Sequence, residues 1–95
     1  MLLTAIIQNV TVEKILGNGS VEITGIQFDS RKIERGNLFV ATRGTATDGH
    51  NYISKAVELG ALAVICEEMP ENTAEHITYV IVKDSAEALG IAASA

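Results

Sequence analysis

Cysteine is nearly absent from this sequence, since Cys66 is the only one among 95 residues. A single cysteine excludes an internal disulfide framework and is typical of proteins in a reducing compartment. Cys66 ends the apolar run Ala63-Val64-Ile65-Cys66, whereas a reactive thiolate needs an electropositive, partly exposed setting. We therefore expect Cys66 to be a buried structural thiol in one globular domain.

Basic residues are also few, with 7 Lys and Arg against 12 Asp and Glu and a formal net charge of −5. This balance argues against general binding to nucleic acids or anionic membranes, which relies on basic patches. It still allows a small anionic ligand held by a few backbone N–H groups. No apolar run approaches the roughly 20 residues of a membrane-spanning helix. The apolar N-terminus lacks the basic region of a signal peptide.

Recognised nucleotide and metal motifs are missing as well. The sequence contains neither a GxxxxGK[ST] phosphate loop nor GxGxxG, so it shows no means of binding ATP or a dinucleotide by those routes. His50, His76 and Cys66 lack the spacing of metal ligands. Ser30 and His50 have no indicated third partner for a catalytic triad. We therefore expect no metal, no cofactor and no catalytic residue within this chain.

Short apolar runs between helical patterns predict an α/β fold, with a small mixed sheet flanked by helices. Helices are expected over residues 2–9, from 49 to 60 and from 85 onward, and strands over 12–16, 21–24, 38–41, 61–66 and 77–82. Residues 38–66 would form a parallel βαβ unit.

Several residues predict where helices begin and end. Gly60 is a natural stop for the middle helix, whose apolar stripe is Tyr52, Ile53, Ala56 and Val57. Asp84 and Glu87 have the spacing of a capping box at the start of the last helix. That helix has no stop signal, which predicts that the chain belongs to a longer protein; a natural helix that frays at its end is the alternative interpretation.

The segment from Phe28 to His50 carries the candidate binding chemistry. Residues 42–48 run from a predicted strand into a helix start, where unpaired N–H groups and the helix dipole favour an anion such as a pyrophosphate. Thr45 and Thr47 add hydroxyl donors, and Ser30 follows another predicted strand end.

A purely structural interpretation of the same residues stays open, because Thr, Gly and Asp are common in loops and caps. Asp48 has the character of an N-cap, and Ser30 that of a turn residue. Asp29 and Arg31 are expected to form a loop-stabilising ion pair. His50 is expected to help fix the helix start, and His76 to be exposed.

Three groups of residues resemble the N-terminal domain of the Mur ligases. They are Asp29-Ser30-Arg31, Gly36-Asn37-Leu38-Phe39-Val40-Ala41, and Gly44 with Asp48-Gly49-His50. Ala56, Gly60-Ala61 and the segment from Tyr79 to Ala95 extend the resemblance over nearly the whole chain. It implies a UDP-sugar-binding N-terminal domain at residues 1–84, and at 85–95 the start of a helix leading to an ATP-binding central domain.

The resemblance also implies roles for individual residues. The positions that match UDP-sugar contacts are Phe28, Ser30, Thr45, Ala46 and Thr47. The positions that match loop-supporting residues are Asp29, Arg31, Gly44, Asp48, Gly49 and His50. Some relatives carry His-Gln-Ala where this chain has Thr45-Ala46-Thr47, so side-chain contacts there are expected to differ.

The family uses ATP and Mg²⁺ to convert a peptide carboxylate into an acyl phosphate, which an amine then attacks. The resemblance is greatest to the cytoplasmic members that add meso-diaminopimelate or L-lysine to UDP-N-acetylmuramoyl-L-alanyl-D-glutamate for peptidoglycan. Implied partners are that substrate and the central and C-terminal domains of the same chain, and this fragment alone is expected to be inactive. Two alternatives remain open: the N-terminal domain of the D-alanyl-D-alanine-adding ligase, and a stand-alone nucleotide-sugar-binding module.

Overall fold

The computed structural model describes residues 1–43 and 48–94 of the chain. In chain order the helices and strands are α1 (Leu3–Ile6), β1 (Val12–Leu16), β2 (Gly25–Gln27), the 3₁₀ helix η1 (Ser30–Lys32), β3 (Asn37–Val40), the 3₁₀ helix η2 (Gly49–Tyr52), α2 (Ile53–Glu58), β4 (Ala63–Cys66), β5 (Thr78–Val82) and α3 (Ser85–Ala93). Four of the five expected strands are confirmed to within two residues at either end.

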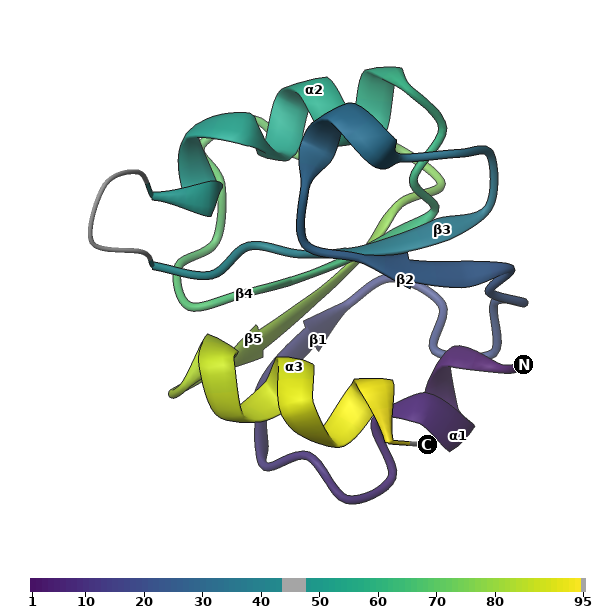
Figure 1. Ribbon diagram of the computed structural model, residues 1–95, viewed down its shortest axis with the longest axis vertical. Coiled ribbons are helices and arrows are strands. Elements are labelled where there is room, and N and C mark those ends of the chain that lie inside the picture. Colours follow the sequence, from purple (N-terminus) through teal and green to yellow (C-terminus); the bar gives the residue numbers. More distant parts are fainter. Residues whose placement is uncertain (44–47, 95) are drawn as a thin grey trace.

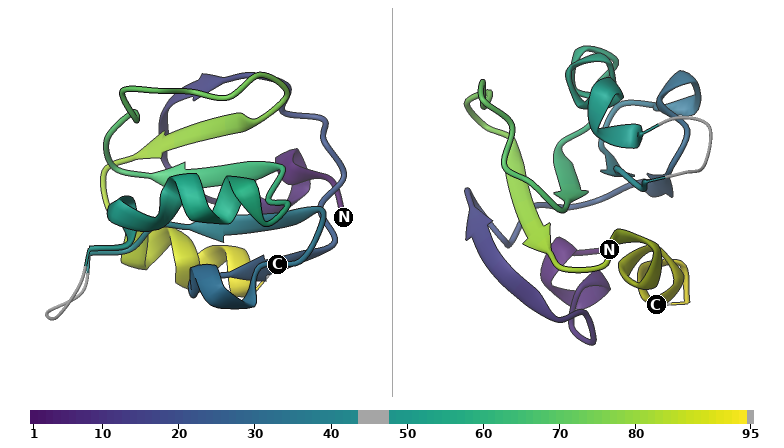
Figure 2. Two further views of the ribbon diagram at one scale, coloured as in Figure 1. Left: turned by 90° about the horizontal axis from the view of Figure 1, so that it is seen from above. Right: turned by 90° about the vertical axis from the view of Figure 1, so that its left-hand side faces the viewer.

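The strands form one five-stranded sheet in the order β1-β5-β4-β3-β2. Strands β2, β3, β4 and β5 are mutually parallel, and β1 pairs with β5 in the antiparallel sense. The mixed sheet and the parallel βαβ unit from β3 through α2 to β4 are therefore confirmed. Figures 1 and 2 show three layers, with α2 on one face of the sheet and α1 and α3 on the other.

Two hydrophobic cores, one on each face, explain why the central strands are continuous apolar runs. In β3, Leu38 and Val40 pack toward α1 and α3, whereas Phe39 packs toward α2. In β4, Ile65 joins the first core and Val64 the second. Parallel strands that are covered on both faces expose neither side to solvent. Their sequences are therefore apolar throughout and do not alternate between apolar and polar residues.

Cys66 lies at the end of β4 in the core beneath α2 and is fully buried. Burial raises the pKa of its thiol to about 11, because the thiolate would lose its hydration. The structural interpretation of this cysteine is confirmed.

The strand expected over residues 21–24 is wrong. This segment has no regular strand, only an isolated bridge between Leu2 and Glu22. Its backbone bonds to the N-terminal segment instead, since the Val21 carbonyl accepts from the Leu3 N–H and the Ile23 N–H donates to the Met1 carbonyl. The apolar residues at 21 and 23 therefore pack against α1 rather than extend the sheet, which gains β2 after Thr24.

The helices also differ in detail from the sequence expectation. The helix expected over 2–9 is a single turn, α1. The helix expected from 49 to 60 begins as η2 and becomes α-helical only at Ile53. Because a 3₁₀ helix has three residues per turn, the predicted stripe loses its phase at Tyr52, which is 42% exposed. Gly60 does end α2, with a φ of 117°.

None of the helices within residues 1–43 and 48–94 has the length and apolar character of a membrane span. The helix α3 begins at an N-cap, Asp84, whose carboxylate accepts a hydrogen bond from the Glu87 N–H. The N-cap bond of the expected capping box is therefore present. Ala88 and Ala92 then bury the inner side of α3 against the sheet.

Candidate functional site

The carboxyl ends of the four parallel strands meet at one edge of the sheet. The segments that leave this edge begin at Phe28 after β2, Ala41 after β3, Glu67 after β4 and Lys83 after β5. In open α/β sheets this edge is where ligands bind, because the connections that leave it form a crevice. The candidate residues at 28–31 and 48–50 therefore converge although they lie far apart in the sequence.

A pocket of about 450 Å³ lies at this edge, between the segment after β2 and η2. Its lining residues are Phe28, Asp29, Ser30, Arg31, Phe39, Thr42, Gly49 and Tyr52. This volume falls within the range of small-molecule sites. The pocket thus brings together residues from both halves of the expected site.

Two exposed aromatic side chains line the pocket. Phe28 is 63% exposed and Tyr52 is 42% exposed. The two remaining aromatic residues of the chain, Phe39 and Tyr79, are 1% exposed. Exposing large rings costs hydrophobic stabilisation, so their concentration around one pocket indicates a surface for a flat or apolar ligand group. Sequence reasoning assigned Tyr52 to the core, and its 3₁₀ geometry explains the error.

Ser30 supplies a hydroxyl at the same pocket. The residue is 7% exposed and is the first residue of η1. Within residues 1–43 and 48–94, its side-chain hydroxyl forms no hydrogen bond with another protein group, although its carbonyl accepts from the Ile33 N–H. No fully buried side-chain nitrogen or oxygen in this part of the chain lacks a partner, so the Ser30 hydroxyl lies at the pocket surface, where it is available to a ligand.

Asp29 and Arg31 form the ion pair expected between them. The Arg31 guanidinium donates to both carboxylate oxygens at 3.0 and 2.8 Å, and the Arg31 N–H donates to the same group. These hydrogen bonds from Arg31 hold the pKa of Asp29 at about 2. The pair fixes the turn that presents Ser30, while the Arg31 side chain remains 87% exposed.

Asp48 and His50 organise the start of η2. The Asp48 carboxylate accepts from the His50 N–H and contacts ring Nδ1 at 2.7 Å. His50 Nε2 accepts from the Glu67 N–H at 2.8 Å. Since Nε2 is an acceptor, the ring proton lies on Nδ1 and is donated to Asp48. Both ring nitrogens are engaged within the protein, so His50 is not a free base for Ser30.

Gly49 closes the base of the pocket by direct backbone contact. Its N–H donates to the Thr42 carbonyl at 2.7 Å, and a Cβ atom at this position would lie 2.8 Å from the Thr42 nitrogen. Only glycine permits this approach without a shift of the backbone. Four of the expected positions, Gly44, Thr45, Ala46 and Thr47, lie outside the described residues.

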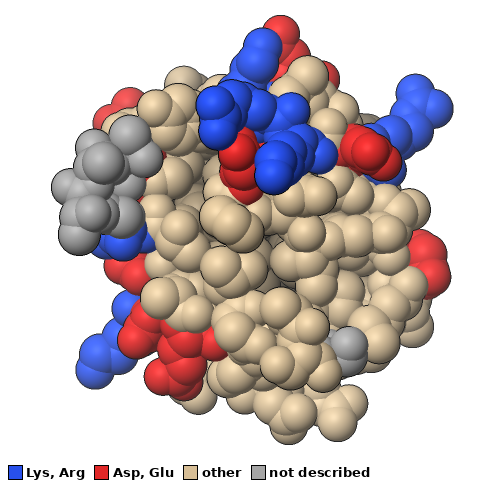
Figure 3. Space-filling view, viewed as in Figure 1, with Lys and Arg blue, Asp and Glu red and all other residues tan. Residues whose placement is uncertain are grey.

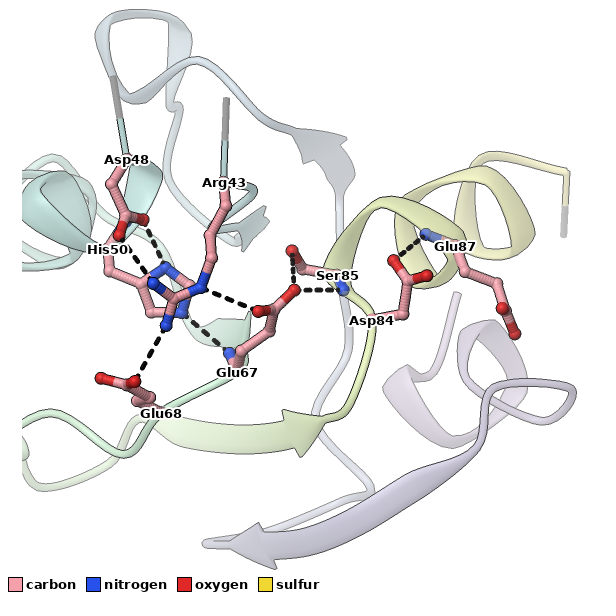
Figure 4. Close-up of polar contacts among 8 residues, drawn as sticks. All are labelled: Arg43, Asp48, His50, Glu67, Glu68, Asp84, Ser85 and Glu87. Carbon is pink, nitrogen blue, oxygen red and sulfur yellow. Dashed lines mark hydrogen bonds and ion pairs between the residues drawn. The ribbon is translucent and has the colours of Figure 1, made fainter. Parts of the chain in front are cut away.

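Sequence reasoning missed Glu67, which it placed in an acidic loop. Glu67 directly follows β4, and its carboxylate accepts hydrogen bonds from Arg43 and Ser85 (Figure 4). A signal was present in the sequence, because residues that follow neighbouring parallel strands lie at the same sheet edge. A charged residue directly after a buried strand should therefore have been considered with Arg43 and Asp48.

Charge is unevenly distributed around the site. Figure 3 shows that Lys and Arg side chains gather on the side of the molecule that carries α2, with a few acidic side chains among them. The broad face in view is largely uncharged.

Within residues 1–43 and 48–94, no group of three or more His, Cys, Asp and Glu side chains is placed to hold a metal ion.

The free energy of unfolding is expected to fall at acidic pH, because carboxylates at this edge of the sheet have lowered pKa values. Hydrogen bonds lower the pKa of Asp29 to about 2, those from His50 lower the pKa of Asp48, and those from Ser85 and Arg43 lower the pKa of Glu67. Groups with depressed folded pKa values stabilise the fold above their unfolded pKa and lose that contribution as pH falls through the folded value. Urea unfolding followed by circular dichroism should therefore show a decreasing free energy of unfolding from about pH 4.5 to pH 2. A constant free energy over this interval would contradict the prediction, and Asp29→Asn should flatten part of the slope.

Comparison with known protein families adds an independent finding. A family model described as "Mur ligase family, catalytic domain" matches residues 22–95. The UDP-N-acetylmuramoyl-L-alanyl-D-glutamate–2,6-diaminopimelate ligase of Phocaeicola vulgatus is 51% identical over 90 residues, which cover 95% of this chain and 19% of that protein. The ligase of the same name from Bacteroides fragilis is 51% identical over 94 residues, covering 99% of this chain and 19% of its own length.

Solved structures show the same arrangement. Crystal structure I of MurF from Acinetobacter baumannii aligns with a TM-score of 0.76 and 28% identity, over 95% of this chain and 19% of that one. The MurF ligase of Thermotoga maritima, solved in complex with ADP, aligns with a TM-score of 0.64 and 29% identity, over 77% of this chain and 16% of that one. The chain therefore spans about one fifth of the length of the relatives it matches.

Proposed function

Because this chain belongs to the Mur ligase family, we propose that it is the UDP-sugar-binding domain of a ligase that joins 2,6-diaminopimelate to UDP-N-acetylmuramoyl-L-alanyl-D-glutamate. The relatives with 51% identity carry the name of that reaction. The solved MurF structures are 27–29% identical, and one of them is named a D-alanyl-D-alanyl ligase, so the D-alanyl-D-alanine-adding reaction is the weaker choice. In the parent protein the product would be a cytoplasmic precursor of peptidoglycan.

The observation that carries this proposal is the pocket at the carboxyl edge of the sheet. It combines two exposed rings, Phe28 and Tyr52, with the Ser30 hydroxyl. A uracil ring stacks favourably on aromatic side chains, and a phosphate or sugar oxygen accepts from a hydroxyl. Arg31 lines the pocket with its side chain 87% exposed, which places a positive charge where an anionic ligand group could meet it despite the net negative charge.

The remaining chemistry belongs to parts of the parent ligase outside these residues. The sequence has no phosphate-loop motif, and the described residues offer no donor set that fits Mg²⁺. We therefore assign ATP, Mg²⁺ and the acyl-phosphate step to the central domain, and the incoming amino acid to the C-terminal domain. Residues 1–84 would hold the UDP-sugar, and 85–95 would begin the connection to the central domain. The role of this domain is to bind and orient the substrate.

Ser30→Ala provides the direct test. Removing a hydroxyl that donates to the ligand should weaken UDP-sugar binding about 2- to 12-fold, the equivalent of about 0.5–1.5 kcal/mol for one hydrogen bond. The measurement is a titration of the ¹⁵N-labelled chain with UDP-N-acetylmuramoyl-L-alanyl-D-glutamate, followed by amide shifts. In the wild type these shifts should cluster at Phe28–Arg31, Thr42 and Gly49–Tyr52.

Ser20→Ala is a matched control, because Ser20 is exposed and does not line the pocket. It should leave the affinity unchanged. Two results would count against the proposal: pocket amides that do not move at millimolar ligand in the wild type, or equal affinities for Ser30→Ala and the wild type.

A further inference from the structure

The Glu67 carboxylate connects Arg43, which lies in the segment after β3, with Ser85, the first residue of α3. Oε1 accepts a hydrogen bond from Arg43 Nε at 2.8 Å. Oε2 accepts from both the backbone N–H and the hydroxyl of Ser85, each at 2.8 Å (Figure 4). Glu67 itself does not line the pocket of Phe28, Ser30 and Tyr52. Its influence on that pocket must therefore pass through its partners.

On one side, Glu67 completes a closed ring of four residues. Arg43 Nη1 pairs with Asp48 Oδ2 at 3.2 Å, and Asp48 Oδ1 contacts His50 Nδ1 at 2.7 Å. His50 Nε2 accepts from the Glu67 N–H, and Glu67 Oε1 returns to Arg43. Arg43 and Asp48 also form an isolated antiparallel bridge. The ring therefore holds residues 42–43 against 48–50.

This ring lies directly beside the pocket. Thr42 and Gly49, the neighbours of Arg43 and Asp48 in the sequence, both line it and are joined by the 2.7 Å hydrogen bond described above. A displacement of Arg43 or Asp48 would thus move the pocket wall. A shift of about 1 Å in a positioned group is enough to lower binding or rate substantially.

On the other side, Glu67 fixes the first turn of α3. Ser85 is the first residue of that nine-residue helix and is 1% exposed. Its N–H is one of the helix donors that lack an intrahelical partner, and the Glu67 carboxylate satisfies it. The negative charge is also favourable at the positive end of the helix dipole. Hydrogen bonds from Ser85 and then Arg43 lower the pKa of Glu67, so the carboxylate is ionised near neutral pH.

We propose that Glu67 is a positioning residue of the ligand pocket, which fixes the wall formed by Thr42 and Gly49 relative to the first turn of α3. A disturbance at Ser85 is then transmitted through Glu67 and Arg43 to Gly49, although Ser85 and Gly49 share no hydrogen bond. Only the identity of the ligand rests on the proposed function. The coupling between Ser85 and Gly49, which is the mechanical claim, concerns this chain alone.

Amide hydrogen exchange of the chain without ligand tests the mechanical claim. Glu67→Gln keeps the side-chain shape, but its amide has one acceptor oxygen and places N–H donors against Arg43 or Ser85. We expect the Gly49 N–H to exchange at least about tenfold faster in this variant, since its local opening becomes easier. Glu68→Gln is the matched control, because the Glu68 side chain is 77% exposed and its ion pair with Arg43 Nη2, at 3.0 Å, involves neither Ser85 nor His50.

A second pair of variants decides the question if Glu67→Gln does not fold. Ser85→Ala removes one of the three hydrogen bonds to the carboxylate and should accelerate exchange at Gly49 about threefold. Ser94→Ala removes a hydroxyl that donates to the Gly90 carbonyl at the far end of α3, and it should leave exchange at Gly49 unchanged. Effects of Ser85→Ala confined to residues 84–88 would overturn the proposal.

Ligand binding supplies a readout that a purely structural role would not move. Calorimetric titration with UDP should show affinity lowered at least fivefold in Glu67→Gln and within twofold of wild type in Glu68→Gln. Equal affinity in wild type and Glu67→Gln would overturn the positioning role. If the wild-type chain does not bind UDP, the proposed function fails, and the exchange experiments still decide whether Glu67 couples α3 to the pocket wall.

Discussion

Replacing Tyr52 or Phe28 by alanine is expected to lower the affinity for a uracil nucleotide roughly 5- to 140-fold. Base–aromatic stacking is worth about 1–3 kcal/mol per base, and each 1.4 kcal/mol is tenfold in affinity. Both rings are exposed by 42% or more, so removing them creates no large cavity in the core. The loss should therefore appear in binding, measured by calorimetry with UDP, and not in thermal stability.

The chain offers matched controls for this prediction. Tyr52→Phe retains the ring and should retain most of the affinity. Leu16→Ala removes a side chain that is 41% exposed on β1, at the opposite edge of the sheet from β2. It should not affect binding. If Tyr52→Ala binds UDP as tightly as Leu16→Ala does, Tyr52 takes no part in base recognition.

The two substitutions also indicate how the rings are used. If Phe28 and Tyr52 contact the same base, the loss in the double variant should be smaller than the product of the single losses, because removing one ring weakens the contact of the other. If the two rings contact separate parts of the ligand, the two fold losses in affinity should multiply in the double variant. The comparison thus distinguishes a shared stacking site from two separate ones.

The sheet was largely predictable because its central strands are short, wholly apolar runs bounded by turn residues. Such runs read as strands only because they are buried on both faces, as Leu38–Ala41 and Ala63–Cys66 are. The segment 21–24 shows the apolar–polar alternation of a half-buried strand, but its backbone bonds to the N-terminal segment. Local periodicity indicates which side chains of a segment are buried. It does not indicate which other segment forms backbone hydrogen bonds with it.

The site was predictable in part. The strand ends before Asp29 and Arg43 could be located from the sequence, and the turn chemistry of Asp48 and Gly49 is local. Tyr52 was misplaced because nothing in the sequence distinguishes a 3₁₀ turn from the first turn of an α-helix. Glu67 was missed because its partners at 43 and 85 are distant in the chain and become neighbours only through parallel pairing.

Parallel topology therefore accounts for both the pocket and its support. Because β2, β3, β4 and β5 point the same way, each contributes its following residues to one edge. The segments after β2 and β3 provide pocket-lining groups, and those after β4 and β5 provide Glu67 and Ser85. The pocket and the last helix are thus linked through adjacent strand ends.

Gly49→Ala is expected to have the largest effect on stability among the substitutions at the pocket. Its Cβ would lie 2.8 and 2.9 Å from the Thr42 nitrogen and oxygen, and both are backbone atoms that cannot rotate away. The backbone must shift, which weakens the Gly49-to-Thr42 hydrogen bond. Overpacking of this kind costs about 1–3 kcal/mol, which corresponds to a melting temperature roughly 4–24 °C lower in a domain of this size.

Gly90→Ala is the matched control with the opposite sign. Gly90 lies within α3, and a Cβ there meets no atom within 4 Å apart from the backbone of its own helix and its chain neighbours. Replacing glycine by alanine in a helix interior stabilises by about 0.5–1 kcal/mol, so the melting temperature should rise by a few degrees. Thermal unfolding of both variants is the measurement. A Gly49→Ala chain as stable as wild type would mean that the contact with Thr42 does not hold the pocket wall, and the support attributed to the ring of Arg43, Asp48, His50 and Glu67 would lose its basis.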